Sequence, residues 1–292
     1  MEDLDAAINY IEVVGINDHI LYFYWGRHQE HSELDMRLGG GTYAIYKGDS
    51  AIIVDTMDLP GQGAWVKNHL QTQYAIKNFM VVNTHWHLDH IAGNQVYANC
   101  SIIGHTDTRT IISANKEAIE AGTLWGGFPA FAAIPPNITF TGRMDLWLDN
   151  LKVELHEFKI HCAGHLSVIL PDDKILLAAD MLEDPIWIFQ FDFASPEIQL
   201  AEFDRMRAMD IDRIYANHCN LDTVKAGGYD KRFIKNNADY LKKMIADVEN
   251  PGFCAHKAQV YIGDALAAGE LTWWEPYSEI HARNIDTIRN LQ

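Results

Sequence analysis

The residues best suited to chemistry form one short segment, Thr84 to His90, which reads Thr-His-Trp-His-Leu-Asp-His. It directly follows an apolar run that is typical of a strand. Side chains alternate along a strand, so His85 and His87 can point the same way from its end, while the next turn brings Asp89 and His90 close. Imidazole and carboxylate suit borderline divalent cations, zinc above all, with iron or manganese as alternatives. The segment predicts a metal site, with a geometry that suits two ions better than one.

The sequence before this segment predicts the elements that position it. Apolar residues alternate as in strands over residues 19–24, 42–46 and 51–55, with a Lys-Gly-Asp turn that predicts antiparallel hairpins. Residues 61–72 have helical spacing, with Trp65, Val66 and Leu70 on one face. A strand, a helix and a further strand therefore lead into the histidines. A weak strand at 101–103 and a helix over 107–121 come next.

The second half of the chain predicts another set of strands, followed by helices. Ser195 as N-cap and Pro196 at the first position predict a helix that runs to about Met209. From Thr223 onward the pattern is mostly helical. The predicted strands begin near Ile138 and include residues 152–158, 166–170, 174–179 and 213–216. The predicted buried face of the first C-terminal helix consists of Phe233, Tyr240, Leu241, Met244 and Ile245.

Composition disfavours several classes of protein. The formal charge of -17, from 23 basic and 40 acidic residues, would repel a nucleic-acid backbone. No apolar run is long enough for a membrane span, and the acidic N-terminus does not resemble a secretory signal. The four cysteines are widely spaced, which favours reduced thiols in a cytoplasmic enzyme. We expect a cytoplasmic protein without a nucleic-acid or membrane partner.

Three further residues lie at predicted strand ends, where additional metal ligands would be needed. His165 precedes one strand, Asp180 ends the apolar run 175–179, and His218 follows the strand at 213–216. A carboxylate at the end of an apolar strand is costly to desolvate unless a cation or hydrogen bonds compensate for it. Taken singly, each residue could equally be a cap or an ordinary loop residue.

Together these residues resemble the metallo-β-lactamase superfamily. The T-H-x-H-x-D-H signature is complete, and Gly93 follows it; Gly164-His165, Asp180 and His218 match the later motifs in order and separation. The resemblance implies an α+β fold, the αββα four-layer sandwich, with two mixed sheets packed face to face and helices outside. It covers about residues 18–220. We therefore expect a catalytic domain at 1–222 and a mostly helical extension at 223–292 packed on the same domain.

The resemblance also implies a ligand set for two metal ions. One ion would be held by three histidines, the other by an aspartate and two histidines, with a second aspartate bridging both. These ligands are His85, His87 and His165 for the first ion, Asp89, His90 and His218 for the second, and Asp180 as the bridge. The usual P-G-H-T-x-G-S is reduced here to Ala163-Gly164-His165-Leu166-Ser167, and Cys219 replaces a common glycine. His161 is therefore a lesser competitor for the role of His165.

Such a centre has a defined chemistry. Two divalent cations, two carboxylates and a bridging hydroxide leave one net positive charge, which lowers the pKa of bound water to about 7 and polarises a carbonyl. We expect a dinuclear zinc hydrolase for a small carbonyl substrate, with a lactone or thioester favoured and a β-lactam as a further alternative. Asp89 or Asp180 would relay a proton to the leaving group. The alternative is an iron-dependent oxidoreductase or dioxygenase of the same superfamily.

Aromatic and histidine-bearing loops are candidates for contacting the substrate. The candidate contacts are His28, His31, Trp125, Phe128 and Trp187. The aromatic residues could equally be part of the core. If they line the cleft, the substrate is a small molecule with an apolar body. The absence of Lys or Arg between Asp180 and Phe203 argues against a penicillin-type carboxylate. The C-terminal helices could cover the cleft or form a homodimer face.

Overall fold

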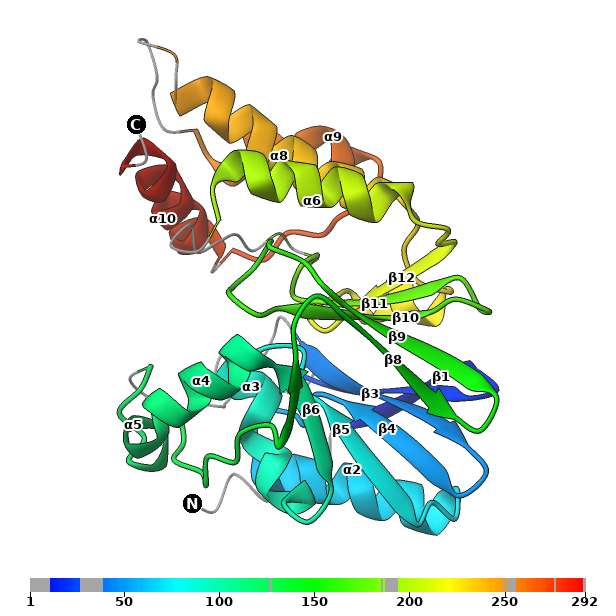
Figure 1. Ribbon diagram of the computed structural model, residues 1–292. Coiled ribbons are helices and arrows are strands. Elements are labelled where there is room, and N and C mark those ends of the chain that lie inside the picture. Colours follow the sequence, from blue (N-terminus) through cyan, green and yellow to red (C-terminus); the bar gives the residue numbers. More distant parts are fainter. Residues whose placement is uncertain are drawn as a thin grey trace. The chain divides into compact units, whose positions relative to one another are not determined.

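Seven strands of the first half of the chain form one mixed sheet in the computed structural model (Figure 1). The first four strands pair antiparallel, as the predicted hairpins require, and β4 to β7 pair parallel through crossover segments. In sheet order the strands are β1 (Glu12–Asn17), β2 (Ile20–Trp25), β3 (Gly40–Lys47), β4 (Ser50–Val54), β5 (Asn78–Val82), β6 (Ser101–His105) and β7 (Ile138–Phe140).

The structure describes residues 11–26, 39–125, 128–184, 186, 194–248, 250, 256–275 and 277–290. The chain divides into two units. The first unit is Met1–Glu157 with Ala163–Leu170, and the second unit is Phe158–Cys162 with Pro171–Gln292. The boundary that we predict after residue 222 stays a prediction.

The core of the first unit lies on both faces of the seven-stranded sheet. All six residues of β2 are buried. Phe23 and Trp25 belong to the same apolar cluster as Val66 of α2 (Pro60–Gln73). On the opposite face of β2, Tyr22 stacks on Tyr43 of β3 at 4.5 Å between ring centroids. Burial on both faces explains why β2 is almost continuously apolar.

The register of the parallel strands fixes where the site begins. Val54 at the end of β4 pairs with Val82 at the end of β5, and the Asp55 N–H donates to the Val82 carbonyl at 2.8 Å. The two strands therefore end at the same level. Asp55 and Asn83 leave the sheet side by side, at the carboxyl edge where sites form in parallel sheets.

Several elements of the first unit differ from the sequence prediction. The strand near Ile138, which we predict to open the second set of strands, is β7 and pairs with β6 in the first sheet. The helix predicted at 107–121 is two helices, α4 (Thr106–Ala114) and α5 (Lys116–Glu120), which are separated at Asn115. Strand β1 was not predicted, because it is only half-buried and interrupted by Gly15, so its apolar alternation is weak.

The remaining described elements of the first unit are two short helices and three strands. The histidine segment leads into two short helices, and three strands form an antiparallel ladder. The helices are α3 (Leu88–Ile91) and the 3-10 helix η3 (Ala92–Tyr97), and the strands are β8 (Arg143–Leu148), β9 (Leu151–Glu157) and β10 (Leu166–Leu170).

The described residues of the second unit form a parallel strand pair and five helices. Its two strands, β11 and β12, pair parallel with each other. Helix α8 packs against α6, α9 and α10 (Figure 1). The elements are β11 (Ile175–Ala179), α6 (Pro196–Ala208), β12 (Arg213–Ala216), α7 (Leu221–Lys225), α8 (Arg232–Val248), α9 (Ala258–Ala267) and α10 (Tyr277–Asn290).

Local signals in this unit behave as predicted. The Ser195 hydroxyl accepts a hydrogen bond from the N–H of Ile198, and Pro196 occupies the first turn of α6. Four of the five residues predicted on the buried face of α8 are buried, and Ile245 is half-buried. Among the helices that the structure describes, none combines the length and apolarity that a membrane crossing requires.

Candidate metal centre

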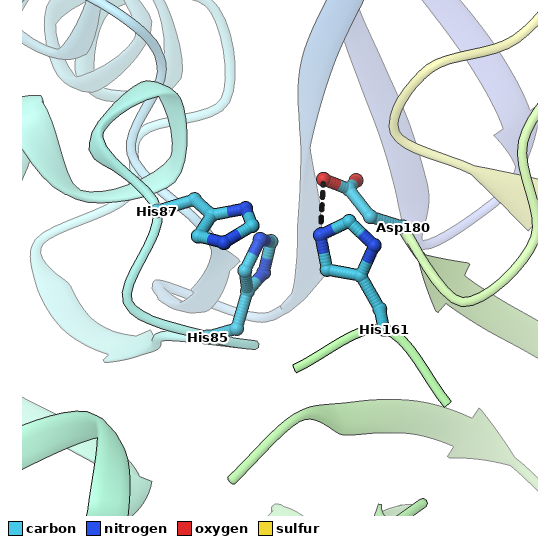
Figure 2. Close-up of side chains that lie close together, drawn as sticks. All are labelled: His85, His87, His161 and Asp180. Atoms are coloured by element: carbon cyan, nitrogen blue, oxygen red, sulfur yellow. Dashed lines mark ion pairs between the residues drawn. The ribbon is translucent and has the colours of Figure 1, made fainter. Parts of the chain in front are cut away.

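In the first unit, three histidine rings gather around the ring of His85. The centroid of its ring lies 4.4 Å from that of His87, 4.2 Å from that of His90 and 4.3 Å from that of His165. All four side chains are buried, and Figure 2 shows two of them, His85 and His87. The structure therefore brings together the four histidines that we predicted from this part of the chain.

Asp89 supplies a carboxylate beside these rings. Its Oδ2 lies 3.4 Å from Nε2 of His90. Asp89 lies in the first turn of α3, which begins at Leu88 directly after the extended N-cap residue His87. The change from extended backbone to helix thus turns Asp89 and His90 back toward the histidines, as the sequence predicted.

Asp55 is a site residue that the sequence analysis missed. Its Oδ1 accepts the Thr84 N–H at 2.7 Å, and its Oδ2 accepts the Thr84 hydroxyl at 2.7 Å. The same Oδ2 lies 2.9 Å from Nδ1 of His90. Donor atoms of Asp55, His85 and His90 all lie within 4.8 Å of one another. A carboxylate that is saturated in this way orients a metal-binding histidine and fixes its tautomer.

Thr84 fixes the tautomer of His85 by the same logic. Its only hydroxyl proton goes to Asp55, an acceptor, so the hydroxyl oxygen accepts from Nδ1 of His85, 3.0 Å away. With the proton on Nδ1, the imidazole lone pair of His85 lies on Nε2. The same assignment holds for His90, whose Nδ1 faces Asp55. Both rings thus present Nε2 as the nitrogen that would bind a metal.

Backbone contacts hold the two histidine-bearing segments together. The N–H of Leu166 donates to the Thr84 carbonyl at 2.8 Å, next to His85 and His165. The Thr108 hydroxyl donates to the Gly164 carbonyl at 3.1 Å. Gly164 has φ +71°, and a Cβ there would lie 2.7 Å from Nδ1 of His105. Glycine is required at 164, and the loop before His165 is held against α4.

Gly93 follows the histidine segment and lets the chain pass close to the backbone of Thr56. A Cβ at this position would lie 2.2 Å from the carbonyl oxygen of Thr56. The close approach lets the N–H of Thr56 donate to the His90 carbonyl at 2.8 Å. Asn94 adds a buried amide pair with Asn83 at 2.8 and 3.0 Å. The end of the histidine segment is therefore fixed to the ends of β4 and β5.

In the second unit, two histidines converge on Asp180. Its Oδ2 lies 3.7 Å from Nε2 of His161 and 3.6 Å from Nε2 of His218. Figure 2 shows the ion pair of Asp180 and His161 as a dashed line. Asp180 and His218 follow the paired strands β11 and β12. The second unit thus brings together two predicted ligands and adds His161, the competitor of His165.

Two acidic residues follow Asp180 and are buried in the same unit. Glu183 and Asp184 are each 2% exposed. Burial raises the pKa of the Asp184 carboxyl, and hydrogen bonds from Thr272 and Tyr229 oppose that rise. No local sequence pattern marks either residue, because their partners lie far along the chain.

Of the predicted substrate contacts, the structure describes two. Trp125 is 39% exposed, and its ring lies edge-on to His87 at 4.8 Å between centroids. Phe128 is half-buried and lies 6.4 Å from the Trp125 ring. His28, His31 and Trp187 lie outside the described residues.

The donors of each unit fit borderline metal ions. The first unit offers four imidazoles and a carboxylate, and the second unit offers two imidazoles and a carboxylate. A gathering of buried imidazoles is costly without a compensating partner, because each ring carries two polar nitrogens. Nitrogen and carboxylate donors of this kind are those of zinc and of related divalent ions.

Comparison with known proteins agrees with this chemistry. The model of the family described as "Metallo-beta-lactamase superfamily" matches residues 80–218, slightly less than half of the chain. The matched region begins in β5 and ends at His218, so it contains every predicted ligand. A search of curated proteins found no match.

Solved structures of metallo-beta-lactamases share the fold. A metallo-beta-lactamase from Pontibacter korlensis is 14% identical with a TM-score of 0.63, and covers 80% of this chain and 99% of its own. The TMB-1 structure is 14% identical with a TM-score of 0.63, and covers 80% of this chain and 98% of its own. DIM-1 metallo-beta-lactamase is 16% identical with a TM-score of 0.61, and covers 80% of this chain and 98% of its own. This likeness confirms the predicted fold class, with its two mixed sheets and helices. Residues 80–218 thus match the model of the metallo-beta-lactamase superfamily, and the chain shares the fold of solved metallo-beta-lactamases.

Proposed function

We propose that this protein is a dinuclear metal-dependent hydrolase that cleaves a lactone or thioester and uses zinc as its native metal. The superfamily consists mostly of hydrolases. The observation that carries the proposal is the set of oriented donors in the first unit, where Thr84 and Asp55 leave Nε2 of His85 and of His90 as metal-binding nitrogens.

The proposed ligand assignment follows the sequence prediction. His85, His87 and His165 would hold one ion, and Asp89, His90 and His218 would hold the other. Asp180 would contact both, and His161 beside it is the alternative to His165. When bound, the ions supply an activated water and polarise the carbonyl oxygen of the substrate.

The side chains have separate tasks in this proposal. Asp55 and Thr84 hold the imidazoles in one tautomer, so that no reorganisation is needed when a metal binds. Asp89 or Asp180 accepts a proton and passes it to the leaving group, since each is a carboxylate at the reacting centre. The chain therefore needs no side-chain nucleophile.

Metal content is the first test. Protein purified without added metal is analysed for zinc, iron and manganese, stripped with a chelator, and assayed on lactones, thioesters and lactams after each metal is returned. We expect two equivalents of zinc and zinc-restored hydrolysis. Full hydrolysis by the stripped protein would contradict the proposal, and two equivalents of iron with no hydrolysis would favour the oxidoreductase alternative. An Asp180→Ala variant that keeps both metals and full turnover would remove Asp180 from both of its roles.

The exposed indole of Trp125 supports a substrate with an apolar body, because it lies directly against the proposed ligand His87. Trp125→Ala should raise KM by about 3- to 10-fold with little change in kcat, since an aromatic contact contributes about 0.5–1.5 kcal/mol. Trp147→Ala is the matched control, because Trp147 is 59% exposed on β8. Equal effects of the two substitutions would remove Trp125 from the substrate site.

The remaining parts of the proposal rest on composition. A cytoplasmic location agrees with the widely spaced cysteines, and a small-molecule substrate agrees with the charge of -17. A homodimer is proposed without an assigned interface. Light scattering and cell fractionation test these points independently of activity.

A further inference from the structure

The second unit contains a buried acidic pair three and four residues after Asp180. Glu183 and Asp184 are both fully enclosed, at 2% exposure. Buried carboxylates are costly unless hydrogen bonds compensate for lost hydration. The partners that compensate here come in part from Thr272 and Tyr277, which lie beyond the family-matched region that ends at residue 218.

Both carboxylate oxygens of Asp184 accept hydrogen bonds. Its Oδ1 accepts the N–H of Thr272 at 2.5 Å and the Thr272 hydroxyl at 2.9 Å. Its Oδ2 accepts the Tyr229 hydroxyl at 2.8 Å. The N–H of Asp184 itself donates to the His218 carbonyl at 3.2 Å. Asp184 therefore connects the C-terminal segment to the backbone of a proposed ligand.

Glu183 makes the second connection. Its Oε2 accepts the Tyr277 hydroxyl at 3.0 Å, and its Oε1 lies 4.0 Å from Nδ1 of His161. The other nitrogen of His161, Nε2, lies 3.7 Å from Oδ2 of Asp180 (Figure 2). A continuous row of side chains thus runs from the first residue of α10 to Asp180, and all four lie in the second unit.

We propose that Tyr277 and Thr272 are positioning residues for the metal centre. They hold residues 180–184 in place and thereby set the orientation of Asp180 and His161 toward the ions. The inference rests on the proposed function, because it assumes that Asp180 binds metal. A ligand on a loop binds tightly only when its neighbours lock its orientation, and outer partners of this kind change metal affinity by about 10–100-fold.

The alternative role for these contacts is to anchor α10 and nothing more. Measuring both metal affinity and thermal stability on the same variants distinguishes the two roles. Tyr277→Phe removes the hydroxyl that donates a hydrogen bond to Glu183. Thr272→Val removes the hydroxyl that donates a hydrogen bond to Asp184. Tyr240→Phe is the matched control, because it removes another buried hydroxyl of this unit, which contacts Nδ1 of His281 at 2.5 Å.

The experiment titrates full-length, metal-stripped protein with Co²⁺ against a competing chelator and records the visible absorption of the bound ion. We expect Tyr277→Phe to lower Co²⁺ affinity by about 10-fold or more and to change the absorption spectrum. Thr272→Val should act in the same direction. Tyr240→Phe should leave both affinity and spectrum as in the unmodified protein, and the Tm of each metal-free variant is measured in parallel.

The outcomes distinguish the two proposals. Unchanged Co²⁺ affinity and spectrum in Tyr277→Phe and Thr272→Val, with a loss of Tm equal to that of Tyr240→Phe, would overturn the positioning role. If the unmodified protein itself binds no Co²⁺, the proposed function fails. If Tyr277→Phe proves too unstable to titrate, Thr272→Val, which keeps the backbone contact to Asp184, decides the matter.

Discussion

Asp55 divides its two carboxylate oxygens between Thr84 and His90 and so decides which nitrogen each neighbouring imidazole presents. It lies in the left-handed region at φ +65°, which is uncommon for a non-glycine residue. Backbone strain of this kind persists where surrounding contacts fix it. At Asp55 those contacts are the hydrogen bonds to Thr84 and His90.

Asp55→Asn should weaken metal binding without preventing folding. In the carboxylate both oxygens accept hydrogen bonds, whereas in the amide only one group accepts and the other donates. Asparagine therefore cannot replace the hydrogen bonds to both Thr84 and His90, and the tautomer of His90 is no longer fixed. We expect zinc affinity to fall by about 10–100-fold, measured by competition with a chelator. Asp210→Asn, at an exposed residue that pairs with Lys174, is the control. Equal affinities in the two variants would show that Asp55 is not required for orientation.

At the scale of elements, the helix that follows the histidines touches the sheet through a glycine. The absence of a side chain at Gly93 lets η3 approach the backbone at Thr56. The approach in turn places His90 within reach of Asp55. The sequence pattern marked Gly93 only as part of a motif, whereas the structure shows its steric reason.

Gly93→Ala should therefore destabilise the protein. The new Cβ would lie 2.2 Å from the carbonyl oxygen of Thr56. This backbone atom cannot move aside as the end of a flexible side chain could. We expect a loss of about 1–3 kcal/mol in unfolding free energy, measured by chemical denaturation. Gly263→Ala lies in α9 with open space around the new Cβ, so it should be neutral or slightly stabilising. A neutral Gly93→Ala would refute the close approach.

Helix α10 carries a buried histidine, His281. Nδ1 of His281 contacts the Tyr240 hydroxyl, and its Nε2 lies 2.9 Å from the His256 carbonyl. The Tyr261 ring lies 5.1 Å away. Burial lowers the pKa of His281 below its ordinary value of 6.5, and the contact with the His256 carbonyl partly opposes this. The folded protein therefore favours the neutral ring.

This shift predicts how stability changes with pH. The unfolded chain takes up a proton near pH 6.5, before the folded protein does, so the contribution of His281 is fully present above that value. It is lost as the pH falls below 6.5 toward the lower pKa of the folded state. As the pH is lowered from 8 to 5, the free energy of unfolding should fall more steeply in the unmodified protein than in His281→Gln. Parallel curves would contradict the prediction.

At the scale of the whole molecule, the proposed ions and the net charge act together. A formal charge of -17 favours cations over anions in general. Imidazole-rich donors select zinc over hard cations such as magnesium, which prefer oxygen ligands. Metal binding to the folded state alone should therefore stabilise the protein selectively.

Thermal unfolding tests this selectivity. Zinc at about 100 times its Kd should add about 2.7 kcal/mol per site and raise Tm by about 5 °C or more relative to stripped protein. Magnesium at the same concentration should leave Tm nearly unchanged. An equal rise with both cations would indicate charge screening rather than ligand-specific binding.

The sequence by itself determined the features that depend on neighbouring residues. The helix cap at Ser195, the hairpins and the histidine segment follow from spacing, because they arise from contacts a few residues apart. The order of the proposed ligands from His85 to His218 also came from the sequence, because it matches a family motif. The fold class followed from that resemblance and is confirmed by the solved structures.

Only the tertiary structure decided which residues support the ligands. Asp55 meets Thr84 because β4 and β5 pair in register, and a sequence does not state its register. Thr272 and Tyr277 reach Asp184 and Glu183 across separations of 88 and 94 residues. Such hydrogen bonds are set by how helices pack after the chain folds, and no local pattern of residues records them.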